Sequence, residues 1–381
     1  METRPINVFV FLGHGFGSNT WERRFSLGLI PGINDRLAYG YYRAACRDWS
    51  IEYSLDEDEG RFVKLMRLIL RKMLGFDLIH AWRNKAHLLS ADIVWTHTEL
   101  EGLAVLLIFR AFGRGRRPKL LANCVWLFDL WPKLSRVRKA LFRHLLKQAD
   151  LVTTLSPENL KVAKRVVPNV RCECVLTGTI VENMKPPHIA PVHSPLRIAS
   201  LGTDMHRDWK TLISAFGNID GYQLRIGSSK VPLDLVANSK NVEVLAAVTA
   251  DDAKRLYEWA DFIVVPLKPN LHVSGITVIF ESVLCAVPIV CSDTGGLEAY
   301  FSNAEICYVP PSDPLAMRAA VAELAKDDNR RFRMLTKAQE RLISADLTTT
   351  GFAERNRKLS EQLFRSHTGE GIRASTITEI A

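Results

Sequence analysis

Residues 261–298 read DFIVVPLKPNLHVSGITVIFESVLCAVPIVCSDTGGLE, and this stretch sets the architecture of the chain. Asp261 to Pro266 predicts a short buried strand, because the run is apolar, rich in β-branched residues and closed by a proline. A loop then leads to a predicted helix from Thr277 to Ala286, which ends before Pro288, and to a second apolar strand that ends at Ser292. This order of strand, loop, helix and strand is typical of a parallel α/β sheet.

The loop inside this unit is a candidate phosphate site. It lies at the carboxyl end of a strand and the amino end of a helix, where free N–H groups and the helix dipole favour an anion. Glu281, near one turn inside the helix, can accept two hydrogen bonds from a ribose diol. The alternative is an ordinary βαβ unit in which Glu281 is a solvated helix residue. The residues that we assign to donor binding here are His272, Ser274, Gly275, Ile276, Thr277 and Glu281.

The stretch resembles the nucleotide-sugar-dependent glycosyltransferases of the GT-B fold, family 4 in particular. That family carries a Glu, seven residues and a second Glu, then a small apolar helix, a proline, a strand and a Gly-Gly turn, and IFESVLCAVPIVCSDTGG matches the second half. The first Glu, which contacts the donor sugar in the family, falls at Val273 here. The resemblance implies an α/β protein with two Rossmann-like doubly wound domains facing across a cleft. It also implies that sugar transfer retains the anomeric configuration.

The rest of the sequence divides into two domains, as 381 residues would suggest. Residues 183–195, NMKPPHIAPVHSP, hold four prolines and little periodicity, and they predict the linker between a first domain at 1–182 and a second at 196–346. Residues 347–367 resemble the terminal GT-B helix that crosses back to the first domain. The polar tail, 368–381, is predicted to be disordered.

Charge is distributed unevenly between the two halves. The net charge is +9, yet residues 1–185 hold 29 Lys and Arg against 18 Asp and Glu, whereas the remainder holds 21 against 23. The first half is therefore the one expected to meet an anionic partner, such as nucleic acid, an anionic membrane or a diphosphate. Because the sequence has no helix-turn-helix, zinc or RNA-binding signature, we expect no nucleic-acid partner.

Residues 61–76 and 135–148 predict two basic amphipathic helices. The first has an apolar stripe flanked by cations, as a helix lying in a membrane interface has. The alternative is a domain helix that packs on the sheet with a solvated basic face. We favour the membrane interpretation because the pattern occurs twice. With no signal-peptide shape, no apolar run of about 18 residues and scattered cysteines, we expect a cytoplasmic protein, peripheral on the inner face of the plasma membrane.

In the first domain, candidate site residues follow predicted strands. The run INVFVFL at 6–12 ends in GHGFGS, and the resemblance brings Gly15 and Gly17 near the donor diphosphate; the alternative is an ordinary tight turn. His97 and Glu99 follow the strand ADIVWT, and Asp129 follows LLANCVW. The carboxyl ends of parallel strands share one sheet edge, so these groups are expected to converge there.

Asp129 is the first choice for a general base, and His97 is a second catalytic candidate. The aromatic residues around Asp129 should desolvate its carboxyl group and raise its pKa. The alternative for Asp129 is the N-cap of the basic helix that follows.

In the second domain, the resemblance extends through LGTDMHRDWKTLISAF and YQLRIGSS, which place Gly202 and Gly227 at the nucleotide. Arg207 and Lys210 are the candidate cations for the departing diphosphate, with Arg207 preferred. The alternative for either is a surface cation at a helix start. Because no Asp-x-Asp motif is evident in this region and no Cys/His cluster suggests a metal, we predict no metal and no cofactor apart from the nucleotide-sugar substrate.

These observations predict a glycosyltransferase that moves a hexosyl or glycuronosyl group to a lipid-linked or saccharide acceptor, as in polysaccharide or glycolipid assembly. The alternative is a regulatory protein that binds a nucleotide sugar without catalysis. The missing carboxylate at Val273 is the observation that supports this alternative. An assay of donor hydrolysis or transfer separates the two.

Overall fold

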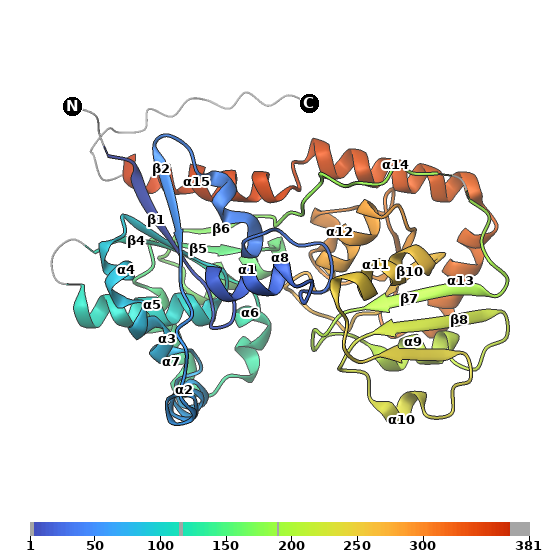
Figure 1. Ribbon diagram of the computed structural model, residues 1–381, viewed down its shortest axis with the longest axis horizontal. Coiled ribbons are helices and arrows are strands. Elements are labelled where there is room, and N and C mark those ends of the chain that lie inside the picture. Colours follow the sequence, from blue (N-terminus) through green and yellow to red (C-terminus); the bar gives the residue numbers. More distant parts are fainter. Residues whose placement is uncertain (1–3, 114–116, 189, 366–381) are drawn as a thin grey trace.

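The computed structural model describes residues 4–113, 117–188 and 190–365. Two domains lie side by side, each built on a sheet of six parallel strands (Figure 1). The predicted fold class, two doubly wound α/β domains, is confirmed. The boundaries that we predicted at the linker stay a prediction, although the second sheet does begin at Leu196.

The first sheet has the strand order β2-β1-β3-β4-β5-β6, so the winding reverses between β1 and β3. Such a switch point opens a crevice at the carboxyl ends of the strands. Its strands are β1 (Ile6–Phe11), β2 (Trp49–Tyr53), β3 (Ile93–Thr96), β4 (Lys119–Cys124), β5 (Leu151–Thr154) and β6 (Cys172–Cys174). The helices around it are α1 (Ser18–Ser26), η1 (Ala38–Ala44), α2 (Arg61–Leu74), α3 (Leu78–Arg83), α4 (Lys85–Ser90), α5 (Glu99–Phe112), α6 (Leu127–Leu130), η2 (Trp131–Lys133), α7 (Arg136–Leu146) and α8 (Pro157–Val166).

The second sheet has the order β12-β11-β10-β7-β8-β9. Its strands are β7 (Leu196–Leu201), β8 (Tyr222–Gly227), β9 (Val242–Leu245), β10 (Phe262–Val265), β11 (Ile289–Ser292) and β12 (Cys307–Val309). Its helices are α9 (Trp209–Phe216), α10 (Leu233–Val236), α11 (Ala250–Trp259), α12 (Ile276–Leu284), η3 (Leu297–Ala299), α13 (Pro314–Ala325) and α14 (Asp328–Ser344). One further helix, α15 (Thr349–Arg365), follows.

The unit β10–α12–β11 forms as predicted. Both strands are buried along their whole length and pair in parallel, with Ile263 opposite Ile289. In α12, Thr277 is exposed and Glu281 is partly exposed, whereas Ile276, Val278, Ile279, Phe280, Ser282, Val283 and Leu284 are buried. A helix that is apolar nearly all round is stable only where it is covered, so this unit forms the centre of the second domain.

The C-terminal helix leaves the second domain and packs on the first. Figure 1 shows α14 and α15 running in succession along one side of both domains. The indole of Trp95 in β3 donates a 2.9 Å hydrogen bond to the hydroxyl of Ser360, and the ring of Phe364 lies against that of Trp49. The last two residues of the predicted crossing helix and the predicted tail, 368–381, lie outside the described residues.

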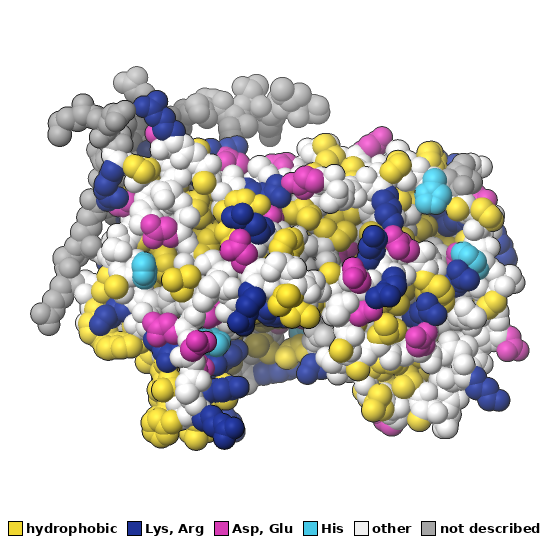
Figure 2. Space-filling model, in the orientation of Figure 1, with side chains coloured by type: hydrophobic (Ala, Val, Ile, Leu, Met, Phe, Trp, Pro, Cys, Tyr) yellow, Lys and Arg dark blue, Asp and Glu magenta, His cyan; other side chains and the backbone are white. Residues whose placement is uncertain are grey.

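Helix α2 presents its apolar stripe to solvent instead of packing it on a sheet. Its only buried residue is Arg67, whose guanidinium pairs with Glu59 at 2.8 Å and with Asp77 at 2.7 Å. Figure 2 shows apolar and basic side chains together on the lobe that α2 forms. The exposed apolar side chains are Phe62 (74%), Leu65 (55%), Met66 (37%), Leu68 (45%), Ile69 (43%) and Met73 (69%).

Helix α7 lies beside α2 but packs differently. It buries Phe142, Leu145 and Leu146 in the core of the first domain. Arg138 of α7 donates a hydrogen bond to the carbonyl of Lys72, at the end of α2. The alternative that we kept open, a helix packed on its own domain, therefore describes α7 and not α2. Among the described residues, no helix is both long and apolar enough to cross a bilayer.

Candidate active site

A cavity of about 650 Å³ lies between the two domains. The first domain contributes the loop at 29–35 and the ends of β3 and β4, and the second contributes residues 201–207, 227–229 and 272–281. Of the predicted donor residues, those from the second domain all line it: Gly202, Gly227, His272, Ser274, Gly275, Ile276, Thr277 and Glu281. The cavity is thus the predicted cleft, formed where strand ends of both sheets meet.

Arg207 is a buried cation on the wall of this cleft. Its side chain is only 4% exposed, and its Nε and Nη1 atoms have no hydrogen-bond partner in the described chain. The guanidinium lies against two glycines, Gly202 with φ +126° and Gly275 with φ +88°, where an added Cβ would fall 2.4 and 2.8 Å from its nitrogens. Burial lowers the pKa of Arg207, because a desolvated cation is disfavoured. Such a group is suited to an anion that enters the cleft.

The amino end of α12 faces the same space. Gly275 is its N-cap and adopts a left-handed conformation, and no side chain caps the first turn. The Ile276 amide donates to the Val273 carbonyl at 3.1 Å, so the N–H groups of Thr277 and Val278, with the guanidinium of Arg207, border one part of the cleft. In contrast, Lys210 is exposed on α9 and does not line the cleft, so the structure gives this predicted cation no contact with the site.

Glu281 is held across the domain interface. Its carboxylate accepts a 3.1 Å hydrogen bond from the amide of Ile33, in the first domain, and a 2.5 Å bond from the hydroxyl of Tyr257. Burial raises the pKa of Glu281 to about 7, although both hydrogen bonds oppose this. The alternative of a solvated helix residue is wrong.

His272 lies between two carboxylates, one from each domain. Its Nδ1 is 2.5 Å from Asp129 of the first domain, and its Nε2 is 3.3 Å from Asp204 of the second. Burial lowers the pKa of His272, but the hydrogen bonds to Asp129 and Asp204 outweigh this and raise it to about 9. Ser274 donates a 2.9 Å hydrogen bond to the other oxygen of Asp204. The His272 ring thus bridges the closed cleft.

Asp129 is neither the free base nor the N-cap that the sequence suggested. One carboxylate oxygen accepts from the Leu271 amide at 2.7 Å, and the other contacts His272. The N-cap of α6 is Trp126, and that of α7 is Ser135. With both oxygens engaged by the opposite domain, Asp129 has none free for the proton of an acceptor hydroxyl.

His97 and Glu99 also have partners within the first domain. The ring of His97 stacks on Tyr39 with centroids 3.3 Å apart, and its Nδ1 is 3.0 Å from the hydroxyl of Tyr41. Burial lowers the pKa of His97 to about 3, so it is a poor proton acceptor at neutral pH. Glu99 accepts from the amides of Val125 at 3.0 Å and Trp126 at 3.2 Å, and it positions that loop.

The glycine loop after β1 does not offer its amides to the donor. The N–H groups of Gly15 and Gly17 each donate a 3.0 Å hydrogen bond to the carboxylate of Asp56. Neither glycine lines the cleft. The prediction that these two residues bind the donor diphosphate is therefore wrong, because a carboxylate of the chain already fills the anion site that they make.

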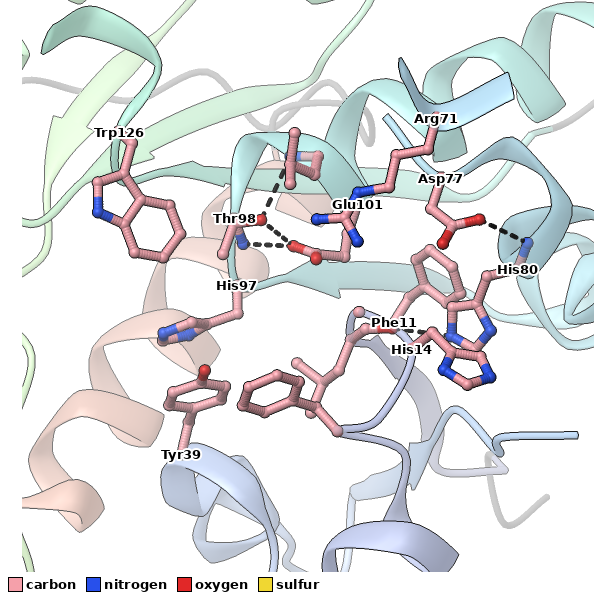
Figure 3. Close-up of a pocket in the computed structure, with 14 residues that line it drawn as sticks. Phe11, His14, Tyr39, Arg71, Asp77, His80, His97, Thr98, Glu101 and Trp126 are labelled. Carbon is pink, nitrogen blue, oxygen red and sulfur yellow. Dashed lines mark hydrogen bonds between the residues drawn. The ribbon is translucent and has the colours of Figure 1, made fainter. Parts of the chain in front are cut away.

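A second cavity, of about 230 Å³, lies within the first domain and adjoins the cleft (Figure 3). Tyr39, His97 and Trp126 line both spaces. Figure 3 shows Arg71 reaching in above Glu101, with the rings of His14 and His80 below Asp77, and Trp126 at the other side. The cavity combines aromatic walls with a cation and two carboxylates, Asp77 and Glu101, as a site for a polyhydroxylated ligand does.

Glu101 is a site residue that the sequence analysis missed. Its Oε2 accepts hydrogen bonds from the amide of Thr98, at 2.7 Å, and from the Thr98 hydroxyl, which fixes the carboxylate in place. Its Oε1 has no hydrogen bond to any described residue and lies beside Gly13. Burial raises the pKa of Glu101 to about 7. The signal in the sequence is the capping box Thr98-x-x-Glu101, which begins α5 at Glu99.

The described residues also contain one group that could hold a metal ion: Asp204, His206 and His272, whose ligand atoms lie within 4.8 Å of one another. The sequence analysis found no metal cluster because Asp204 and His272 are 68 positions apart. Only the fold of the second domain brings their side chains together.

Comparison with known proteins agrees with this geometry. Residues 199–327 match the family model described as Glycosyl transferases group 1. No curated protein matches the chain in sequence. Among solved structures, sucrose-phosphate synthase from Thermosynechococcus elongatus has 15% identity and a TM-score of 0.71, covering 94% of this chain and 100% of its own. Anabaena HepE in complex with UDP-glucose has 11% identity and a TM-score of 0.64, covering 95% and 99%.

A UDP-forming α,α-trehalose-phosphate synthase from Burkholderia xenovorans has 10% identity and a TM-score of 0.64, covering 96% of this chain and 100% of its own. The fold is therefore GT-B over nearly the whole chain. Within this fold, residues 199–327 are similar to the group 1 glycosyltransferase domain.

Proposed function

We propose that the protein transfers a sugar, with retention of configuration, from a nucleoside diphosphate sugar held on the second domain to an acceptor held on the first. The observation that carries this proposal is the buried Arg207 guanidinium, with two unpartnered nitrogens, beside the uncapped amino end of α12. A diphosphate supplies the oxygens that both groups lack. That HepE was solved with UDP and with UDP-glucose supports a nucleotide at the same cleft.

In this proposal, the diphosphate leaves toward Arg207 and the first turn of α12, which stabilise the negative charge that develops. No metal ion is needed there, because a cation and a helix dipole already face the leaving group. The acceptor enters the cavity of the first domain, and the free Oε1 of Glu101 orients its hydroxyl group. Tyr39 and Trp126, which line both cavities, separate the two substrates.

A regulatory protein without catalysis is the second candidate, and Val273 favours it. This residue stands where the family carries a carboxylate, is 1% exposed and has a left-handed backbone with φ +56°. A β-branched residue in that conformation is strained, and it cannot contact a sugar hydroxyl as a carboxylate does. Release of nucleoside diphosphate only when a sugar acceptor is present would exclude this candidate.

The nucleotide can be identified by thermal shift against UDP, GDP, ADP and their sugars. We expect one of the three series to raise Tm by several degrees, because a ligand that binds only the folded protein stabilises it by mass action. Glu281→Ala should abolish most of that shift, since it removes the acceptor for the ribose diol. Tyr257→Phe is the matched control: it deletes the other Glu281 contact, keeps the carboxylate and should preserve the shift. A full shift in Glu281→Ala would show that the ribose lies elsewhere.

We further propose that the acceptor is lipid-linked and that α2 docks the enzyme on the inner face of the plasma membrane. The exposed apolar face of α2 is flanked by Arg61, Lys64, Arg71 and Lys72, which match anionic headgroups. Arg71 belongs to α2 and also lines the acceptor cavity. A lipid-linked substrate could therefore stay in the membrane while its headgroup enters the cavity. The cations of α7 would add to the attraction.

Co-sedimentation with vesicles tests this docking. We expect binding to phosphatidylglycerol-containing vesicles but not to pure phosphatidylcholine. The double substitution Phe62→Ser and Met73→Ser should weaken binding by about tenfold or more, because burying each of these side chains contributes about 1.5–3 kcal/mol. Leu233→Ser is the matched control, since Leu233 is 73% exposed on α10, in the other domain. Equal binding of all three proteins would contradict docking through α2.

A further inference from the structure

We propose that Asp204, His206 and His272 form a binding site for a divalent transition-metal ion of the Zn²⁺ class on the wall of the donor cleft. All three residues belong to the second domain, and Asp204 and His272 line the cleft. The proposed ion is distinct from the groups that neutralise the diphosphate, which are Arg207 and α12. The inference rests on the side-chain geometry, and it stands whether or not the proposed sugar transfer is correct.

The spacing of the ligand atoms suits such an ion. His272 Nε2 is 3.3 Å from Asp204 Oδ2, and His206 Nδ1 is 3.3 Å from Asp204 Oδ1. Tetrahedral zinc, with bonds of about 2.0–2.1 Å, holds its ligand atoms roughly 3.3 Å apart. The two imidazole rings lie with centroids 4.8 Å apart at an angle of 63°. The three ligand atoms lie within 4.8 Å of one another, so they would move closer together to hold one ion.

The surroundings of each ligand also favour a metal ion. His206 Nδ1 is buried, and its 3.3 Å contact with Asp204 Oδ1 does not have the geometry of a hydrogen bond. His272 directs its Nδ1 to the Asp129 carboxylate at 2.5 Å, which leaves Nε2 for the ion. A carboxylate behind the second ring nitrogen is the usual outer partner of a zinc-bound histidine. Asp204 is itself held by the His206 amide at 2.7 Å and by the Ser274 hydroxyl at 2.9 Å.

The ligand set also selects the kind of ion. Two imidazoles and one carboxylate favour zinc and its neighbours over Mg²⁺ or Ca²⁺, which prefer oxygen ligands. Three protein ligands leave a fourth position open toward the cleft, as in zinc sites that bind a small molecule. Because Asp129 comes from the first domain, an ion bound here would be held most tightly when the cleft is closed.

Zinc binding to the full-length protein, measured by competition with a chromophoric chelator, tests the proposal. We expect one equivalent to bind with micromolar or lower Kd, unaffected by millimolar Mg²⁺. His206→Gln should weaken binding more than tenfold, and so should His272→Gln. Asp129→Asn should weaken it about 10–100-fold, as loss of an outer partner does. A Co²⁺ spectrum without thiolate bands would show that the seven cysteines are not the ligands.

His193→Gln is the matched control, because His193 also faces an aspartate, Asp261, at 2.8 Å but is half-exposed and does not line the cleft. It should bind zinc as the wild type does. His206→Gln removes only the 3.3 Å contact between the ring and Asp204, so its fold should survive, and an unchanged Tm verifies this. Absence of stoichiometric binding to the wild type, or binding by the His206 and His272 variants as tight as that of the wild type, would overturn the proposal. A nucleotide-induced shift that persists in His206→Gln would leave the proposed function standing in either case.

Discussion

Arg207→Gln should abolish the stabilisation by nucleotide and lower kcat/KM for the donor by about 10²–10³-fold, the usual effect of removing one group that stabilises developing charge. The guanidinium is the cation whose nitrogens are buried in the cleft without partners. A neutral amide cannot offset the charge of a diphosphate at this position. Thermal shift with the best nucleotide and steady-state kinetics measure the two effects.

The free Arg207→Gln protein should be at least as stable as the wild type. An unpaired, desolvated cation destabilises the fold, so its removal costs little. Lys210→Gln is the matched control, since Lys210 is three positions along, exposed on α9 and outside the cleft. It should leave both the Tm shift and kcat/KM unchanged. If instead Lys210→Gln loses activity and Arg207→Gln does not, the diphosphate site has been placed wrongly.

Glu101→Gln should lower the rate of transfer by about 10²–10⁴-fold, the range for a side chain that handles the acceptor proton. The carboxylate is fixed by Thr98 through one oxygen and presents the other to the acceptor cavity. The carboxylate accepts a hydrogen bond from the hydroxyl of the acceptor only when it is ionised. Burial raises its pKa to about 7. The wild-type rate should therefore rise with pH through about 7 and level off above it. In Glu101→Gln this rise should be absent.

Glu99→Gln is the matched control for Glu101→Gln. Glu99 is buried on the same first turn of α5, but its carboxylate accepts from the amides of Val125 and Trp126, and a glutamine oxygen can still accept there. The transfer rate of Glu99→Gln should still rise with pH through about 7. Nucleotide-induced stabilisation should persist in both variants, which shows that the donor site is intact. An unchanged pH profile in Glu101→Gln would assign the rise to another group.

The sequence predicts the centre of the second domain because the signals there are local. The apolar runs of β10 and β11, the proline after α12 and the glycines at the loop act within a few residues of their own position. The same locality explains why the fold class could be predicted, and why the second-domain residues assigned to the donor all line the cleft. Arg207 was preferred over Lys210 from sequence, and only the structure places it in the cleft.

Residue roles that depend on distant contacts could not be read from the sequence. Asp129 contacts His272, which is 143 positions away in the sequence. The amide of Gly17 donates a hydrogen bond to Asp56, which is 39 positions away. No local pattern encodes either contact. The exposure of α2 is a different case: its amphipathic sequence fits packing or membrane docking equally well, and only the absence of a covering element in the described chain distinguishes it from α7.

A crystal structure with the nucleoside diphosphate selected by thermal shift tests the central claim most directly. The account predicts phosphate oxygens within hydrogen-bond distance of Arg207 and of the amides in the first turn of α12, with the ribose at Glu281 in place of the Ile33 amide. A nucleotide bound in the first-domain cavity, or on the surface with Arg207 still unpaired, would contradict it.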